Sequence, residues 1–345
     1  MKKFKLKIAC FILPFVLSYL GFLFFGSEEK GDLLRIGYLI DKTKNYREKF
    51  QNDFSKEILY TEFSNINGKR KFDLFTIGDS FSQQKGYGYQ NYLSEKNISV
   101  LHYNKSCNSL KTLYSFIKGD FFEKLQIKYV LIQSAERYIL SRSNDIQINK
   151  TLFFDDLIGG NKNGDIEIIK KTLDLPKFFS PSIVKFPLNF LYHFDDNAFF
   201  SKVYRVKTSK QLFTIGNKEL LFSEEDYKNA IDTNKDKIEN LNKELNLLSK
   251  KLKQKGVKLI VLPSPDKYDI YYKYFKSKEK YPEPIFFEYL SKYKKEYIFI
   301  NSKKILNEIM EEKKDLYFFD DTHWSPIATK LISKKIKEII MNDNQ

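Results

Sequence analysis

Two short segments, far apart in the chain, contain the residue types that nucleophilic catalysis needs. "FTIGDSFS" (75–82) places Ser80 directly after an apolar stretch, and "DDTHWSP" (320–326) places His323 behind two carboxylates. A serine hydroxyl is a weak nucleophile until a neighbouring base removes its proton, and histidine suits that task because its pKa is near neutral. Both Asp320 and Asp321 are close enough in sequence to orient the histidine. We therefore expect Ser80, His323 and one of these aspartates to form a triad.

The elements around the two segments predict that they meet at one edge of a sheet. Apolar stretches of strand length alternate with helical stretches and cover residues 72–77, 98–103, 128–134, 257–265 and 296–301. Such alternation is typical of a parallel sheet flanked by helices, an α/β fold. Ligands of a doubly wound sheet bind at the carboxyl ends of its strands. Ser80 follows the first strand and His323 precedes a closing helix at 325–340, so both are expected at that edge.

The middle of the chain, about residues 140–221, interrupts this alternation. It contains a turn cluster, "GGNKNGD" (159–165), and an aromatic stretch with three prolines (175–194). We interpret it as an insertion or cap that could contact substrate. After it, Ser223 and Asp226 predict a capping box, followed by a helix with an apolar stripe from Ile231 to Leu252.

The first 26 residues predict a membrane anchor and an extracytoplasmic location. Lysine-rich "MKKFKLK" precedes an uncharged apolar run (8–25), and the residues after it make a poor signal-peptidase site. The lysines before the run place the N-terminus inside. We expect a single-pass protein of the inner (cytoplasmic) membrane, with residues 27–70 as a stalk packing onto a periplasmic domain at 71–345.

Composition excludes several classes of function. The net charge of +15 would suit an anionic partner such as an acidic glycan, but the lysines and arginines are spread along the chain. No nucleic-acid-binding motif appears, so nucleic acid is not an expected partner. No cysteine or histidine spacing predicts a metal site, and we expect neither a metal nor a cofactor.

The two segments resemble those of a known family. "GDSFS" and "DTHWSP" are similar to blocks of the SGNH hydrolase superfamily, specifically of its alginate O-acetyltransferase-like branch. "PSPDKYDIY" (263–271) and the "ER" pair in "IQSAERYI" (132–139) add to the resemblance. It implies an SGNH-like (flavodoxin-like) sheet, with Ser80 as nucleophile and His323 as base. The DTHW spacing selects Asp321 as its partner, whereas the D-x-x-H spacing of the wider superfamily selects Asp320.

The resemblance also implies further contacts around the reacting carbonyl. The N–H of Ser80 would contribute to an oxyanion hole, and Cys107 occupies the place of the family's oxyanion glycine. Gln133 or Arg137 would replace a missing asparagine, although Arg137 could instead pair with a buried carboxylate. The remaining candidates each have two interpretations: Lys267 binds an anion or pairs with an acid, and Trp324 lines the acceptor sugar or packs the loop. His102 and His193 are expected to be structural.

These features predict a membrane-anchored serine O-acyltransferase that O-acetylates an extracytoplasmic glycan through an acyl-enzyme. The resemblance implies a separate membrane-bound partner that exports the acyl group, because this chain has one apolar run. Two alternatives stay open. The same triad would serve a carbohydrate acetylesterase, and the unusual oxyanion blocks would suit a non-catalytic scaffold of a polysaccharide assembly complex.

Overall fold

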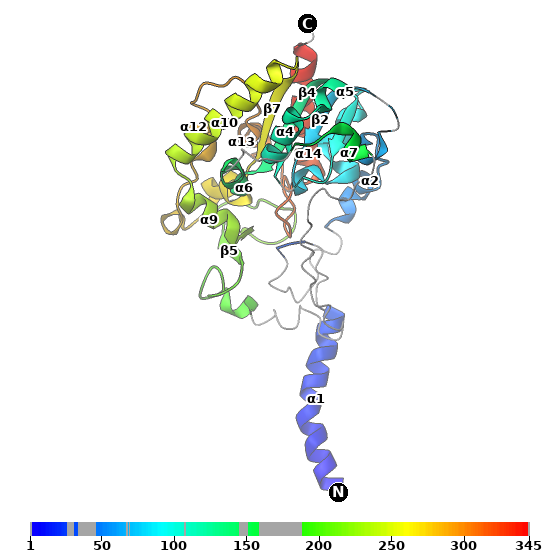
Figure 1. Ribbon diagram of the computed structural model, residues 1–345. Coiled ribbons are helices and arrows are strands. Elements are labelled where there is room, and N and C mark those ends of the chain that lie inside the picture. Colours follow the sequence, from blue (N-terminus) through cyan, green and yellow to red (C-terminus); the bar gives the residue numbers. More distant parts are fainter. Residues whose placement is uncertain are drawn as a thin grey trace.

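The computed structural model describes residues 2–25, 31–33, 46–66, 68, 70–106, 108–144, 151–158 and 188–343. Most of these residues surround one parallel sheet (Figure 1). Its six strands are, in spatial order, β1 (Thr61–Glu62), β3 (Val100–Tyr103), β2 (Lys71–Ile77), β4 (Gln126–Ala135), β7 (Lys258–Ser264) and β8 (Ile298–Phe299). All pairings within it are parallel. The predicted parallel sheet flanked by helices is therefore confirmed, and it fits an SGNH-like fold.

The strand order contains a switch point beside Ser80. From β2 the chain passes to β3 on one side, and then crosses back to β4 on the other side of β2. At such a reversal the loops leaving neighbouring strands diverge, which opens a crevice at the carboxyl ends of the strands. Ser80 follows β2 by three residues and so lies at this crevice.

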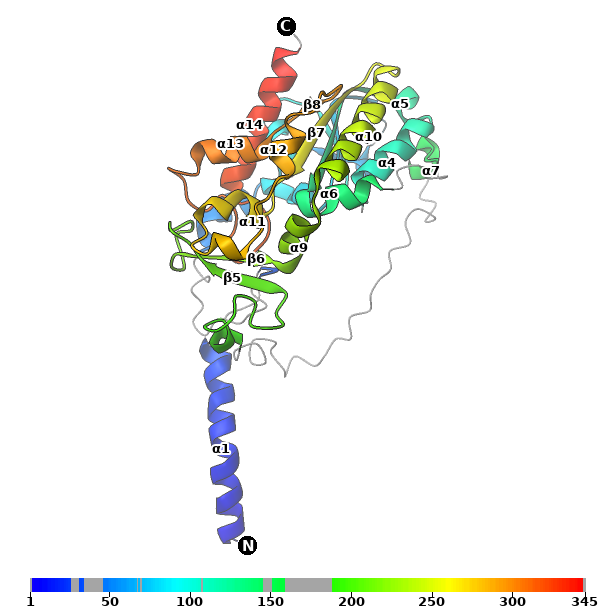
Figure 2. The same ribbon diagram turned by 90° about the vertical axis from the view of Figure 1, so that its left-hand side faces the viewer.

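Helices cover both faces of the sheet. Figure 2 shows α13 and α14 on one side and α4 and α10 on the other. The α-helices in chain order are α1 (Lys2–Phe25), α2 (Gln51–Phe54), α3 (Tyr89–Ser94), α4 (Ser109–Lys118), α5 (Phe121–Lys124), α6 (Glu136–Ser143), α7 (Phe154–Ile158), α9 (Glu224–Asp232), α10 (Lys235–Lys253), α11 (Lys267–Tyr271), α12 (Phe286–Leu290), α13 (Ser302–Ile309) and α14 (Pro326–Asn342). Short 3₁₀ helices are η2 (Glu48–Phe50), η3 (Phe63–Asn65), η4 (Ser80–Ser82), η5 (Lys85–Tyr87), η6 (Tyr272–Tyr274) and η7 (Lys278–Lys280).

Alternating side chains of the strands build a separate core on each face. In β4, Tyr129 and Leu131 point into the core shared with α3, α13 and α14, whereas Val130 and Ile132 point into the core shared with α4 and α10. The closing helix α14 begins where its sequence predicts, because Ser325 accepts a hydrogen bond from the N–H of Ile327 and Pro326 occupies the first turn.

The single long helix expected after Ser223 is wrong, because the structure divides it. Helix α9 ends at Asp232, and α10 begins after Asn234, whose side chain caps it by accepting from the N–H of Lys237. Ile231 consequently lies outside the apolar stripe and is exposed. The predicted capping box is also incomplete. Ser223 accepts from the N–H of Glu225, but Asp226 is buried and pairs with an arginine described below.

The predicted insertion lies only partly within the described residues. Residues 145–150 and 159–187, including the turn cluster and most of the aromatic stretch, lie outside them. The described part contains an antiparallel hairpin of β5 (Val203–Lys207) and β6 (Glu219–Ser223). Buried side chains of this hairpin, among them Phe222, join the core on the α14 side.

The N-terminal apolar run forms helix α1, with Pro14 inside it. The side chains of residues 21–25 and all of residues 26–30 lie outside the described part of the chain. Among the residues that the structure describes, no helix combines the length and the apolar character needed to cross a membrane. The anchor therefore stays a prediction.

Two leucines of α10, one buried and one partly exposed, test how this helix packs on the sheet. Leu245 is fully buried against the sheet, whereas Leu247, two residues further on, is 40% exposed. We expect Leu245→Ala to lower the free energy of unfolding by about 2–5 kcal/mol, because it leaves a cavity. Leu247→Ala should change it by less than about 0.5 kcal/mol. Urea unfolding of the full-length chain measures both, and equal losses would contradict this packing.

Candidate active site

Ser80, His323 and Asp321 form a continuous hydrogen-bonded chain. Ser80 opens η4 directly after the turn that follows β2, and His323 lies in the loop before α14. Nε2 of His323 is 2.7 Å from Oγ of Ser80, and Nδ1 of His323 is 2.5 Å from Oδ1 of Asp321. The same Oδ1 accepts from the backbone N–H of His323 at 3.0 Å, which holds the short D-x-H turn closed. The arrangement has the connectivity of a serine nucleophile, a base and an orienting carboxylate.

The two candidate aspartates have different partners. Arg47 forms a forked pair with Asp320, with Nε to Oδ2 at 3.0 Å and Nη2 to Oδ1 at 2.9 Å. Asp320 is fully buried, and both of its oxygens are engaged in this pair. Asp321 instead faces His323, and its Oδ2 is 3.3 Å from Nη2 of Arg47. The structure therefore brings Asp321, and not Asp320, to the histidine.

The pair of His323 and Asp321 stabilises the charged form of both groups. Burial by itself would lower the pKa of His323, but the hydrogen bond and the negative charge of Asp321 outweigh burial and raise it. Burial would likewise raise the pKa of Asp321, whereas the contacts with His323 and the charge of Arg47 lower it. The site therefore favours a protonated imidazole at His323, next to the hydroxyl of Ser80.

The turn that carries Ser80 is held by the carboxylate of Asp79. Its Oδ1 accepts from the N–H of Phe81 at 3.2 Å, and its Oδ2 accepts from the N–H of Ala135, at the end of β4, at 2.7 Å. Arg142 donates to the same Oδ2 at 2.5 Å. The second residue of the Gly-Asp-Ser turn therefore ties Ser80 to the neighbouring strand of the sheet.

Gln133 stabilises this turn through hydrogen bonds. Its Oε1 accepts from the N–H of Asp79 at 3.1 Å and from Oγ of Ser82 at 2.8 Å, while its Nε2 donates to Oγ of Ser264 at 2.9 Å. Gln133 is fully buried. The structure does not support the expected role of Gln133 as an amide donor to the oxyanion, because both ends of its amide bind other protein groups. A Cβ on Gly78 would lie 2.6 Å from Oε1 of Gln133 and 2.0 Å from Oγ of Ser82, so this packing requires glycine.

Lys267 binds the main chain of the loop that leads to His323. It is fully buried, and its Nζ donates to the backbone oxygens of Phe318 at 2.9 Å and Phe319 at 3.0 Å. Burial lowers its pKa to about 8. In the part of the chain that the structure describes, Lys267 forms no direct ion pair, and its donors are directed at main-chain carbonyls.

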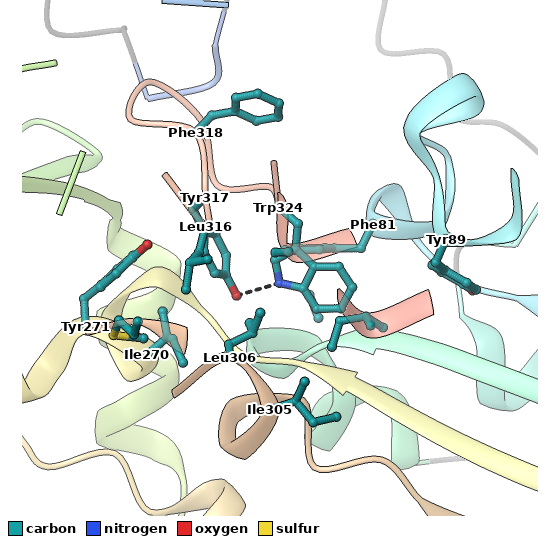
Figure 3. Close-up of a cluster of buried hydrophobic side chains, with 14 of the residues drawn as sticks. Phe81, Tyr89, Ile270, Tyr271, Ile305, Leu306, Leu316, Tyr317, Phe318 and Trp324 are labelled. Carbon is teal, nitrogen blue, oxygen red and sulfur yellow. Dashed lines mark hydrogen bonds between the residues drawn. The ribbon is translucent and has the colours of Figure 1, made fainter. Parts of the chain in front are cut away.

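Trp324 packs the loop and does not line a sugar site. It is fully buried, and its Nε1–H donates to the hydroxyl of Tyr317 at 2.8 Å. Figure 3 shows this bond within an apolar cluster, with Phe81 beside the indole. Of the interpretations left open for Trp324, packing is the one that the structure supports. Cys107, the candidate at the family's oxyanion glycine, lies outside the described residues.

Arg137 is buried at the base of the site between two carboxylates. Its Nη1 donates to Asp266 at 2.7 Å and to Asp226 at 3.2 Å, and its Nη2 is 3.4 Å from Oγ1 of Thr322. Its Nε is buried without a hydrogen-bond partner in the described part of the chain. Burial raises the pKa of Asp226 to about 6, although the charge of Arg137 opposes this rise. Both interpretations of Arg137 therefore survive, because it pairs with carboxylates and also borders the pocket at Ser80.

The triad opens into a polar pocket of about 460 Å³. Its walls come from widely separated segments, including Asp32, Arg137, Lys202, Glu225 and Thr322. A volume of this size would admit a sugar unit or an acyl donor. Four of its lining residues also border a second hollow of about 300 Å³ along α6 and α9, namely Arg137, Tyr138, Glu225 and Lys228. The two hollows therefore adjoin each other and extend the polar pocket along α6 and α9.

One set of side chains in the described part of the chain is close enough to hold a metal ion. Donor atoms of Asp32, Asp321 and His323 lie within 4.8 Å of one another. Each is already engaged within the protein, because Asp32 accepts from Thr322 and Asp321 contacts His323 and Arg47. The geometry therefore favours a hydrogen-bonded triad over a cation site.

The other two histidines do not face the triad. His102 is buried in β3, where its Nδ1 is 2.9 Å from Oγ1 of Thr76, and burial lowers its pKa to about 4. His193 is exposed and does not line the pocket. Sequence reasoning missed Arg47 and Asp32. Both contact residues 320–322, and neither lies in a recognisable motif.

Residues 214–345 match the family model described as "SGNH hydrolase-like domain, acetyltransferase AlgX". The resemblance to this family is therefore confirmed for the C-terminal part of the chain. The match includes the DTHW block with Asp321 and His323 but begins after Ser80, so the serine is assigned by geometry. No curated protein and no solved structure matches the chain.

The electrostatics of the pair can be tested by NMR titration of the three histidines in the full-length chain. We expect the pKa of His323 to lie above its ordinary value of about 6.5 and Asp321→Asn to lower it, because the mutation removes the neighbouring negative charge. His102 should titrate near pH 4 in both proteins. Since folding raises the pKa of His323, its contribution to stability should be complete below about pH 6.5 and be lost as the pH rises through the folded-state value. An unchanged pKa of His323 in Asp321→Asn would contradict the pairing.

Proposed function

We propose that this protein is a serine O-acyltransferase that transfers acetyl groups to an extracytoplasmic polysaccharide. The observation that carries the proposal is the hydrogen-bonded chain from Ser80 through His323 to Asp321 at the mouth of a polar pocket. The acetyltransferase family matched by residues 214–345 supports the choice of acyl group and acceptor. The distance of 2.7 Å between Ser80 and His323 argues against the non-catalytic scaffold.

In the first half-reaction, Oγ of Ser80 attacks the acyl carbonyl carbon of the donor while Nε2 of His323 takes the hydroxyl proton. The tetrahedral intermediate collapses, the bond to the leaving group breaks, and His323 returns the proton to that group. An acetyl ester on Ser80 remains. The N–H at the start of η4 and the guanidinium of Arg137 are the donors we assign to the developing oxyanion.

In the second half-reaction, a glycan hydroxyl enters the pocket and gives its proton to His323 as it attacks the acetyl carbon. The bond to Oγ of Ser80 breaks, and His323 returns the proton to the serine. Net transfer of one acetyl group leaves the enzyme unchanged. The acyl donor would be supplied by a separate membrane-bound protein, as the family resemblance implies.

An acetylesterase is the alternative. Ser80 is exposed, and the pocket wall is polar, so water can reach the acyl-enzyme. Chemically the two functions differ only in the acceptor of the second half-reaction, water or a sugar hydroxyl. The partition of acetyl between these acceptors distinguishes them.

The acyl-enzyme can be tested with para-nitrophenyl acetate and intact mass spectrometry of the full-length chain. We expect an adduct of about 42 Da, one acetyl group, on wild type and its loss in Ser80→Ala. Turnover in Asp321→Asn should fall by about 10⁴-fold because the histidine loses its orienting charge. Ser55→Ala, at an exposed serine outside the pocket, is the matched control. An adduct that persists in Ser80→Ala would place the nucleophile elsewhere.

Oligosaccharide acceptors then separate the two functions. Faster loss of the adduct together with acetylated sugar indicates transfer, whereas release of acetate at a rate that is independent of the sugar indicates an esterase.

We also propose that α1 anchors the protein in the inner membrane with its N-terminus inside and the catalytic domain in the periplasm. The uncharged run at 8–25 and the lysines before it support this topology. We expect the full-length chain to remain in the membrane fraction after alkaline carbonate extraction, and Leu13→Lys/Leu17→Lys to release it because two charges would enter the apolar run. Release of the wild-type chain by carbonate would contradict the anchor.

A further inference from the structure

Three residues near the start of the chain lie directly on the loop that carries His323. Oδ1 of Asp32 accepts from the backbone N–H of Thr322 at 2.8 Å, and Oδ2 accepts from the hydroxyl of Thr322 at 2.6 Å. The N–H of Leu33 donates to the backbone oxygen of Asp320 at 3.0 Å, and Leu33 is 2% exposed. This segment is therefore bonded to the residues on both sides of Asp321.

The contact is close enough to require glycine at residue 31. A Cβ on Gly31 would lie 1.9 Å from the backbone oxygen of Asp320. Real Cβ atoms do not approach backbone oxygens so closely, so any larger residue would displace either residues 31–33 or the histidine loop. We call residues 31–33 the strap.

The strap also forms part of the pocket wall. Asp32 and Leu33 line the same cavity as Ser80 and His323. Thr322 is the central residue of the Asp321–Thr322–His323 turn. Both hydrogen bonds that Asp32 accepts therefore act at the centre of this turn. A carboxylate that holds a backbone N–H and a side-chain hydroxyl of one residue restricts both the position and the rotation of that residue.

We propose that Asp32 is a positioning residue of the active site and that the strap must be seated on the 320–323 loop for Ser80 and His323 to react. The proposal rests on the proposed function, since it concerns the same triad. Asp32 would hold Thr322, and through it the ring of His323, within hydrogen-bonding distance of Ser80. Small displacements of such a base slow catalysis strongly, by about 100-fold for about 1 Å.

A second consequence concerns charge. The charged groups that act on His323 are Asp321, Asp32 and Arg137, with Arg47 acting through Asp321. The negative charge of Asp32 favours the imidazolium form, as that of Asp321 does. Loss of the Asp32 charge should therefore lower the pKa of His323 and shift the rising limb of the pH–rate profile to lower pH.

The experiment compares wild type with Asp32→Asn, Asp32→Ala and Thr322→Val in the full-length chain. We expect Asp32→Ala to form the acyl-enzyme about 100-fold more slowly than wild type. Asp32→Asn keeps one acceptor oxygen but no charge, so it should retain more rate than Asp32→Ala while showing the same downward shift in the pH profile. Thr322→Val removes the hydroxyl contacts with Asp32 and with Nη2 of Arg137 but keeps the backbone bond to Asp32 and both charges, so it should lower the rate without shifting the profile. Asp156→Asn, at an exposed aspartate outside the pocket, is the matched control.

Histidine NMR titration separates failure of this proposal from failure of the proposed function. If wild type forms no acyl-enzyme, the pKa of His323 still reports whether Asp32 acts on it. Wild-type rates and an unchanged pKa of His323 in Asp32→Ala would overturn the proposal. Should Asp32→Ala fail to fold, as judged by its urea unfolding curve, Asp32→Asn decides by both readouts and Thr322→Val by the rate alone.

Discussion

The arrangement of this active site depends on the neutralisation of carboxylates buried at the carboxyl edge of the sheet. An isolated buried charge costs several kcal/mol, so each such group must find a cation or a set of N–H donors. Three arginines fill this requirement at three points: Arg142 at the serine turn, Arg47 at the histidine loop and Arg137 at the base of the pocket. Their carboxylate partners are Asp79, Asp320 and the pair Asp226 and Asp266.

Each of these ion pairs joins elements that are distant in sequence. Arg142 links α6 to the turn after β2, and Arg137 links α6 to α9 and to the residue that precedes α11. Burial raises the pKa of Asp266 and, to about 6, that of Asp226, whereas the charge of Arg137 lowers both. A single arginine therefore faces two buried carboxylates.

The loop before α14 that carries His323 contains no helix or long strand, and side chains from other segments hold it in place. Lys267 donates to two of its main-chain carbonyls, and Arg47 pairs with two of its carboxylates. Asp32 accepts a hydrogen bond from the backbone N–H of Thr322. All three holding groups are charged, so each bond is stronger than a neutral one. A loop fixed in this way can present Nε2 of His323 to Ser80 without a helix or strand at that position. The N-terminal and C-terminal segments of the chain are joined at the same place.

Much of the architecture could be read from local sequence because it rests on local physics. The strand and helix alternation, the Gly-Asp-Ser turn and the Ser-Pro start of α14 all follow from hydrophobic period and turn chemistry within a few residues. Placing Ser80 and His323 at one edge then required only the rule that parallel strands end on the same side. By contrast, the break between α9 and α10 escaped prediction because the apolar spacing continues across it.

What only the tertiary structure decided was which way each polar side chain faces. Asp320 and Asp321 are adjacent and chemically identical, and the position of Arg47, more than 270 residues away, separates a buried structural carboxylate from the partner of His323. Local sequence left two interpretations open for Lys267 and for Trp324 and offered Gln133 as an oxyanion donor, yet packing directs each of these side chains into the protein. Asp32 and Arg47 carry no local signal at all. Residue type and spacing determined the chemistry available to this chain, whereas long-range packing and the pairing of buried charges decided which residues use it.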